Sequence, residues 1–331
     1  MADSNFLLVA ALVLVLGAEF VNGWTDAPNA IATVVSTRVL SPSLAVLMAA
    51  VLNIVGAVVT GTAVATTIGT GIVKPEIISL PVIFAAMLTI IIWSMVAWFY
   101  GIPTSESHEL VAGLAGAGLA IAGPSVLLWE GWVKVLIGLG FSTVLGFSLG
   151  MGVMTSLYWL LRRTSVSSIR GVFSRLQILS AAFMAFSHGS NDGQKFMGVF
   201  TLALVLGGKM AHFAVPVWVM LLCGVVMGIG TALGGWRIIR TVGFKITKLE
   251  PIQGFAAESS GAFAILLASH FGIPLSTTHC IGTSIMGVGA TRRFSAVRWG
   301  IARNIVMTWI ITFPACAALG WIIASLLELA F

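Results

Sequence analysis

The chain has 331 residues, of which 58% are hydrophobic and only 8% are charged. A soluble protein carries roughly a quarter charged residues to cover its surface, so this composition excludes an ordinary soluble globular protein. The net charge of +6 comes from short basic clusters between apolar segments. We therefore expect membrane lipid around the chain and no nucleic-acid partner.

Long stretches of the chain contain no Asp, Glu, Lys or Arg. A helix needs about 20 mainly apolar residues to cross the hydrocarbon core of a bilayer, and each stretch meets that length. The pattern predicts an all-α polytopic membrane protein. The charge-free stretches are 43–73, 77–105, 110–129, 135–161, 210–236, 259–291 and 304–327.

The first half of the chain predicts an odd number of membrane crossings. Residues 7–37 form one crossing with a break near Asp26, and 43–62 form a second. Residues 77–122 form either two full crossings or a re-entrant hairpin that returns to the same side, and 133–160 form the last crossing. A second half of the same design therefore starts from the opposite side of the membrane.

Two motifs occur twice, in the same order. Residues 20–29 (FVNGWTDAPN) align with 186–195 (FSHGSNDGQK), and 101–108 (GIPTSESH) align with 272–279 (GIPLSTTH). This internal duplication predicts two inverted-topology repeats, 1–161 and 178–331, joined by a basic cytoplasmic linker at 162–177. Inverted repeats with broken helices and re-entrant hairpins that meet at the membrane midplane are the architecture of many secondary transporters.

The positive charges favour one orientation. With both termini outside, the outer loops hold only Lys74, Lys134 and Lys209. Basic loops stay in the cytoplasm, so we expect a multi-pass protein of the plasma (inner) membrane. The inner loops then hold Arg38, Arg162, Arg163, Arg170, Arg175, Arg237, Arg240, Lys245, Lys248, Arg292, Arg293, Arg298 and Arg303.

The first duplicated motif indicates a cation site. Asp26 and Asp192 lie in apolar surroundings, where a carboxylate is costly unless it faces a partner or a cavity. Pro28, Gly189 and Gly193 are expected to interrupt their helices and to free backbone carbonyls. Together these hard oxygen atoms suit Na⁺, or the carboxylates accept H⁺. The expected cation ligands are Asn22, Asp26, Asn29 and Asp192, with Na⁺ at Asp26, Asn29 and Asp192.

The second duplicated motif indicates an anion site. Pro103 and Pro274 are followed at once by hydroxyl side chains, which places hydroxyls beside the free N–H groups of a helix N-terminus. Two such N-termini facing each other would suit a tetrahedral oxyanion, and the alternative is that Ser105 and Ser276 are ordinary N-caps of a helix broken by proline. The expected anion ligands are Thr104, Ser105, Ser276, Thr277 and Thr278.

The paired motifs resemble the duplicated signature of the inorganic phosphate transporter (Pit) family. The resemblance rests on 22–32 (NGWTDAPNAIA), 188–195 (HGSNDGQK) and the two Gly-Ile-Pro-x-Ser-x-x-His elements. It implies phosphate as the substrate, with Asn191 and Asp192 binding substrate and cation. The first copy departs from the family pattern, with Thr25 in place of Asn and with Glu106 and Ser107 in place of Thr-Thr.

Three further polar residues fit more than one role. The amide of Gln194 is a candidate donor to the oxyanion. Lys195 either faces phosphate, pairs with a carboxylate or extends toward the interface. Glu258 is either an extra cation ligand or an interfacial residue.

The leading hypothesis is a symporter that moves inorganic phosphate by alternating access, coupled to Na⁺ or, as the second choice, to H⁺. Alternatives of the same fold are a symporter of sulfate and an H⁺-coupled symporter of metal–phosphate. No continuous polar stretch favours an anion channel, and no nucleophile–base pair favours an enzyme. No cofactor other than the transported ion is expected. The build is compatible with a homodimer.

Overall fold

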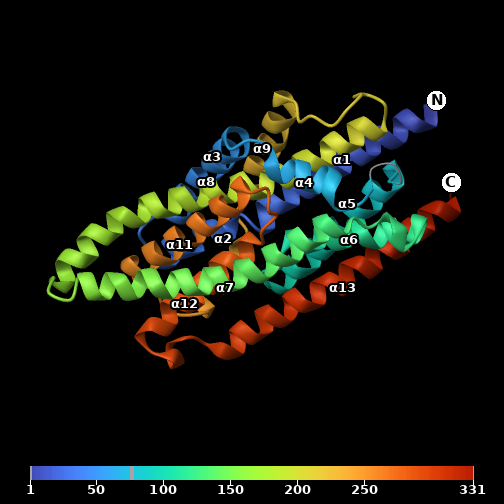
Figure 1. Ribbon diagram of the computed structural model, residues 1–331. Helices are drawn as coiled ribbons and strands as arrows, with labels where there is room; N and C mark the ends of the chain where they lie inside the picture. The colour runs from blue at the N-terminus through green and yellow to red at the C-terminus, as the bar shows by residue number, and fades with distance from the viewer. Residues whose placement is uncertain (1, 75–77, 331) are drawn as a thin grey trace.

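The computed structural model describes residues 2–74 and 78–330, which form a bundle of helices of very different lengths (Figure 1). A π-helix (Thr241–Lys245) and short 3-10 segments connect some of them. In chain order, the α-helices are α1 (Ala2–Thr25), α2 (Pro28–Ser36), α3 (Pro42–Val59), α4 (Ala63–Gly71), α5 (Leu80–Tyr100), α6 (Glu106–Ala122), α7 (Trp129–Leu160), α8 (Val166–Leu206), α9 (Val217–Ala232), α10 (Trp236–Arg240), α11 (Pro251–His270), α12 (Thr277–Arg292) and α13 (Trp299–Ala330).

Six helices of the described part are long and apolar enough to cross a membrane, or seven if α9 and the segment bent from it by 62° count as one span. Large apolar side chains such as Phe141 on α7 and Ile310 on α13 point outward, with 54% and 60% of their surface exposed. Such an apolar outer surface is stable against lipid and unfavourable against water. The expected all-α polytopic membrane fold is therefore confirmed.

The first half shows the predicted break and a hairpin at the first Gly-Ile-Pro motif, together with a short helix, α4, that the sequence did not predict. α1 ends at Thr25 and α2 begins at Pro28, which gives the predicted break beside Asp26. Residues 80–122 form a helical hairpin, α5–α6, in which Gly101 adopts a left-handed conformation (φ 66°). The corresponding hairpin of the second half is α11–α12, with Gly272 at φ 65°. Glycine is suited to both turns because it has no Cβ to clash.

The second copy of the Asp motif does not interrupt its helix. Gly189 and Gly193 were expected to break α8, but α8 runs without a break from Val166 to Leu206. A Cβ at Gly189 would lie 2.2 Å from the carbonyl oxygen of Asn53, and one at Gly193 would lie 2.8 Å from Cβ of Ala57. These glycines allow α3 to pack closely on α8, which is the usual role of small residues between membrane helices.

The helices of the two halves pair reciprocally. α3 packs on α8, and its counterpart α9 packs on α1; likewise α12 packs on α7, and α6 packs on α13. Both termini lie at one end of the molecule, and the turn between α7 and α8 lies at the other (Figure 1). This pattern agrees with a duplicated unit arranged about a two-fold axis. The inverted orientation of repeats 1–161 and 178–331 in a bilayer stays a prediction.

The apolar core is divided into two clusters, with polar residues between them. Along α1 and α2, one cluster includes Ala18 and the other begins at Ala30. Along α8, the division falls between Ala185 and Phe196. Both aspartates of the duplicated motif lie in these gaps, so the fold places them together between two apolar layers.

Candidate functional site

The two hairpins meet tip to tip at their Gly-Ile-Pro motifs. Ser105 and Ser276 are the N-caps of α6 and α12, and their hydroxyls accept bonds from the backbone N–H groups of His108 (3.4 Å) and His279 (3.3 Å). The hydroxyl of Ser276 also donates to that of Ser105 at 2.8 Å. Two helix N-termini, each a favourable place for an anion, therefore converge in the interior.

An aromatic cluster supports both tips. The rings of His108 and His279 lie edge to face with centroids 4.6 Å apart, and His279 stacks on Trp309 of α13 at 3.7 Å. The indole N–H of Trp309 donates to the carbonyl oxygen of Pro103 at 3.2 Å. One tryptophan thus contacts both hairpins and positions the tips relative to each other.

Asp26 lies at the break between α1 and α2 and is bound by neutral donors. Asn29 donates to its Oδ1 at 2.5 Å, and the hydroxyl of Thr278 donates to the same oxygen. Thr277 lies within hydrogen-bonding distance of Oδ2, at 3.3 Å. None of these donors carries a charge, although Asp26 is only 4% exposed.

Asp192, by contrast, has a charged partner. Lys195, one turn further along α8, forms an ion pair with its Oδ1. Thr277 donates to Oδ2 at 2.9 Å, so this threonine lies between the two aspartates. Nε2 of His188 lies 3.2 Å from the same Oδ2.

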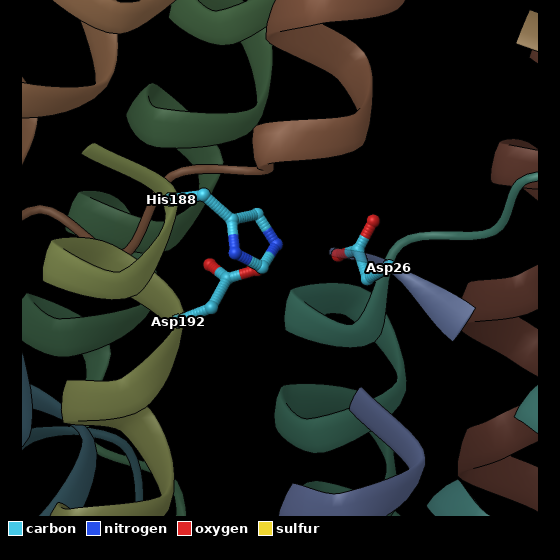
Figure 2. A group of neighbouring side chains, drawn as sticks. All are labelled: Asp26, His188 and Asp192. Atoms are coloured by element: carbon cyan, nitrogen blue, oxygen red, sulfur yellow. The ribbon is translucent and has the colours of Figure 1, made fainter. Parts of the chain in front are cut away.

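Asp26, His188 and Asp192 point toward one another from α8 and from the break after α1 (Figure 2). One ligand atom of each lies within 4.8 Å of the others, and all three side chains are buried. Nδ1 of His188 faces Oδ1 of Asn53 at 3.2 Å, so the opposite ring nitrogen is directed into the cluster. Two carboxylates and an imidazole can hold a cation.

Lys195 contacts parts of both hairpins. Besides Asp192, its ammonium group donates to the hydroxyl of Ser107 at 2.6 Å and to the carbonyl oxygen of Leu275 at 3.2 Å. The side chain is 1% exposed. Of the roles left open by the sequence, pairing with a carboxylate is therefore the observed one, and extension to the interface is not.

The duplication is preserved in these contacts. Asn29 and Lys195 occupy equivalent positions of the first motif, and each donates to the aspartate three residues before it. Asn29 also donates to Thr278 at 3.2 Å, and Lys195 donates to the equivalent Ser107 of the other hairpin. The geometry is symmetric, but the charge is not, because only the second copy carries an ammonium group.

Two glutamates at the start of α6 also face the interior. The hydroxyl of Thr25 donates to Oε1 of Glu106 at 2.6 Å, and Ser94 donates to Oε2 of Glu109 at 2.5 Å. Both carboxyl groups are buried. The second hairpin has Thr277 and Cys280 at these positions, so the two carboxyl groups of the first hairpin have no counterpart there.

Several predicted ligands lie outside this cluster. Gln194 donates to the carbonyl oxygen of Ser190 and to Thr60, and accepts from the N–H of Val64, so its amide is occupied by the protein. Asn191 donates to Ser269 on α11 at 2.9 Å. These contacts occupy the amide of Gln194 and the NH₂ group of Asn191, whereas Oδ1 of Asn191 has no hydrogen-bond partner among the described residues. A role of either residue in phosphate binding stays a prediction.

Glu258 forms a separate buried cluster. Its carboxylate accepts from Thr33 and Ser180, and from Gln177 at 3.1 Å. The side chain is fully buried, which excludes an interfacial position. Thr104 is buried at the tip of the first hairpin, and Asn22 is buried one turn before Asp26.

The sequence predicts no ligand role for the His188 side chain, and it places Ser107 among the hydroxyls after Pro103 without indicating its partner. A signal for the histidine was available, because residues four apart on a helix lie on the same face and His188 precedes Asp192 by four. The hydrogen bond between Lys195 and Ser107 could be predicted only by knowing that the two hairpin tips meet.

Comparison with known proteins identifies the family. The model of the phosphate transporter family matches residues 22–320. This chain belongs to the phosphate transporter family. A probable low-affinity inorganic phosphate transporter of Rhizobium meliloti is 46% identical over 312 residues, covering 94% of this chain and 93% of the relative. One of Bacillus subtilis is 40% identical over 333 residues, covering 99% and 100%.

A solved structure shows the same fold. "The sodium-dependent phosphate transporter" superposes with a TM-score of 0.89 at 26% identity, covering 98% of this chain and 100% of that one. The family and these relatives are transporters, so the chain is an integral membrane transport protein and not an enzyme. The resemblance expected from the duplicated motifs is confirmed.

Proposed function

We propose that this phosphate transporter family member is a cation-coupled symporter of inorganic phosphate that works by alternating access. One observation carries the proposal: Thr277, at the N-terminus of α12, links Asp26 and Asp192 in a buried centre where both hairpin tips meet. Cation ligands and anion-binding helix ends therefore share one enclosed site, which is the arrangement that coupled binding requires.

The coupling cation is assigned to Asp26. Asp192 already has the ammonium group of Lys195, whereas Asp26 has only neutral donors. A buried carboxylate without a positive partner is unfavourable, and a bound cation would provide one. Asn29 and Thr278 offer further oxygen atoms. We favour Na⁺, because these ligands are hard oxygens and because the similar solved structure is named as sodium-dependent.

Phosphate is assigned to the converging hairpin tips. Ser105, Ser276 and Thr277 offer hydroxyls beside helix N-terminal N–H groups, and Lys195 offers an ammonium group that can exchange a protein partner for a phosphate oxygen. Glu106 makes the α6 end less favourable for an anion. We therefore expect the closer phosphate contacts at the α12 end.

A second candidate function is supported by His188. Na⁺ prefers oxygen ligands, but an imidazole beside two carboxylates is a donor set for a divalent metal. This donor set supports symport of a metal–phosphate complex with H⁺ as the second candidate. Sulfate is a tetrahedral oxyanion of similar size to phosphate and is the remaining substrate alternative.

Uptake by purified protein in proteoliposomes tests these assignments. Labelled phosphate, sulfate and arsenate are offered under separate Na⁺ and H⁺ gradients, each with and without Mg²⁺ or a chelator. Uphill phosphate accumulation that requires the Na⁺ gradient and ignores the chelator is the expected result. Accumulation driven by H⁺ and abolished by the chelator would favour the metal–phosphate function, and downhill flux alone would contradict symport.

The orientation is proposed from charge. We place the basic loops in the cytoplasm and both termini outside the plasma membrane, following the positive-inside rule. A reporter that is active only in the cytoplasm, fused after residue 331, should be inactive. The same reporter inserted after Arg163, in the turn between α7 and α8, should be active.

A further inference from the structure

A second buried carboxyl group lies on α1, outside the contacts described so far. Glu19 precedes Asn22 by three residues, so the two side chains lie on one face of the helix. Both are fully buried, with 0% exposure. Among residues 2–74 and 78–330, no hydrogen-bond partner is found for either oxygen of Glu19 or for either polar atom of the Asn22 side chain.

The elements around α1 offer Glu19 no free positive charge. α1 packs against α5, α8 and α9. α8 contributes Asp192 and Lys195, whose charges act on Glu19, and α9 contributes the thiol of Cys223. α5 (Leu80–Tyr100) contains no Asp, Glu, Lys, Arg or His.

Lys195 cannot neutralise Glu19 in this arrangement. An ammonium group has three donors, and Lys195 uses them on Asp192, Ser107 and the carbonyl of Leu275. The centre thus contains the carboxyl groups of Glu19 and Asp26 in addition to the paired Asp192, and Lys195 is the one buried lysine among the described residues. The imidazole of His188 faces Asp192. A buried carboxylate left unpaired is strongly destabilising, so positive charge has to enter from outside the protein.

We propose that Glu19 and Asn22 form a further binding position for a small monovalent cation, Na⁺ or H⁺, next to the Asp26–Asp192 centre. The inference rests on the proposed symport function and adds one coupling ion to it. Na⁺ would use the Glu19 carboxylate and the Asn22 amide oxygen, whereas H⁺ would bind Glu19 directly. In either case one more positive charge accompanies each phosphate.

The test compares wild type with Glu19→Gln, which keeps the shape of the side chain and removes its charge. The voltage at which phosphate flux reverses in proteoliposomes gives the number of Na⁺ and H⁺ moved per phosphate. We expect Glu19→Gln to move one cation fewer, in the Na⁺ arm if Na⁺ binds and in the H⁺ arm if H⁺ binds. Glu328→Gln, at an exposed position of α13, serves as the control and should match wild type.

An unchanged ratio in both arms for Glu19→Gln would overturn the inference. Absence of uphill phosphate uptake by wild type would instead overturn the proposed function, so the two failures are distinguishable. If the variant folds but does not transport, ions are counted on purified protein. Loss of one bound Na⁺, or of the infrared C=O band of a protonated carboxyl group, supports the site, and retention of both contradicts it.

A more conservative variant covers the case in which Glu19→Gln does not fold. Glu19→Asp keeps the charge but withdraws it by one methylene group. We expect an unchanged coupling ratio and a several-fold weaker apparent affinity for the coupling ion. Wild-type affinity in Glu19→Asp would contradict a direct role in cation binding.

Discussion

Ser105 and Ser276 are 171 residues apart in the chain, yet their hydroxyl oxygens lie 2.8 Å apart. Each caps a helix whose N-terminus faces the centre, so this hydrogen bond joins the ends of the two hairpins. Both side chains are buried, with 1% exposure. The contact therefore closes the centre, and it has to break if one hairpin moves to open the site to one face of the membrane.

The first prediction concerns this contact. A double variant, Ser105→Cys with Ser276→Cys, should form a disulfide under mild oxidation and lose phosphate uptake, because the tips can no longer separate. Reduction should restore uptake to the level of the double variant before oxidation. Each single variant is the control and should be insensitive to oxidant, since the three native cysteines are buried. Full uptake by the cross-linked protein would contradict movement at this contact.

The second prediction separates the two aspartates. Asp26→Asn removes a carboxylate that has only neutral partners, so the protein should fold normally and lose ion-driven accumulation. Asp192→Asn should also lose transport but be less stable, because it leaves Lys195 buried without its partner. Removing one member of a buried ion pair costs about 3–5 kcal/mol. Thermal unfolding of both variants in detergent measures the difference, and equal stability would contradict the assigned pairing.

Much of the fold could be predicted, because the apolar composition indicates membrane helices and the duplicated motifs indicate two similar halves. Four of the charge-free runs cover most of a span-length helix, namely α3, α5, α7 and α13, and the predicted last crossing of the first half ends at Leu160, as α7 does. α1 and α8 also have the length of a span, but each contains charged residues and lies outside these runs. The break at Asp26 could be predicted because proline is favoured in the first turn of a helix and disfavoured in its interior. The continuity of α8 could not be predicted, because a glycine in a membrane helix either interrupts the helix or allows another helix to pack closely against it. Only the structure, with Asn53 of α3 directly against Gly189, shows which of the two applies.

The candidate site could be predicted in part for the same reason. The two aspartates and the hydroxyls after each Gly-Ile-Pro come together as expected, because repeated polar residues in apolar helices need a shared interior. The partners of Lys195 depend on which hairpin tip packs against α8. The spacing of residues along the sequence does not predict that packing. Gln194 and Asn191 have signature positions but point to neighbouring helices.

The third prediction concerns Lys195. Lys195→Met keeps much of the side-chain volume and removes the bonds to Asp192, Ser107 and the carbonyl of Leu275. We expect loss of phosphate binding and a destabilisation of about 3–5 kcal/mol, because Asp192 is left unpaired. Binding and unfolding of the purified protein provide the measurement. Lys134→Met, at an exposed position of α7, is the control and should retain both properties.

The last prediction tests the reciprocal packing of the two halves. A Cβ at Gly116 on α6 would lie 1.9 Å from the carbonyl oxygen of Ala317, and one at the equivalent Gly287 on α12 would lie 2.2 Å from that of Phe147. Backbone cannot move aside as a side chain can, so Gly116→Ala and Gly287→Ala should each destabilise the protein by about 1–3 kcal/mol or more. Gly140→Ala on α7 meets nothing within 4 Å and should leave the unfolding temperature unchanged or raise it, since alanine favours helix. Because the two contacts are equivalent, a large effect at one glycine and none at the other would show that the halves do not pack as matching units.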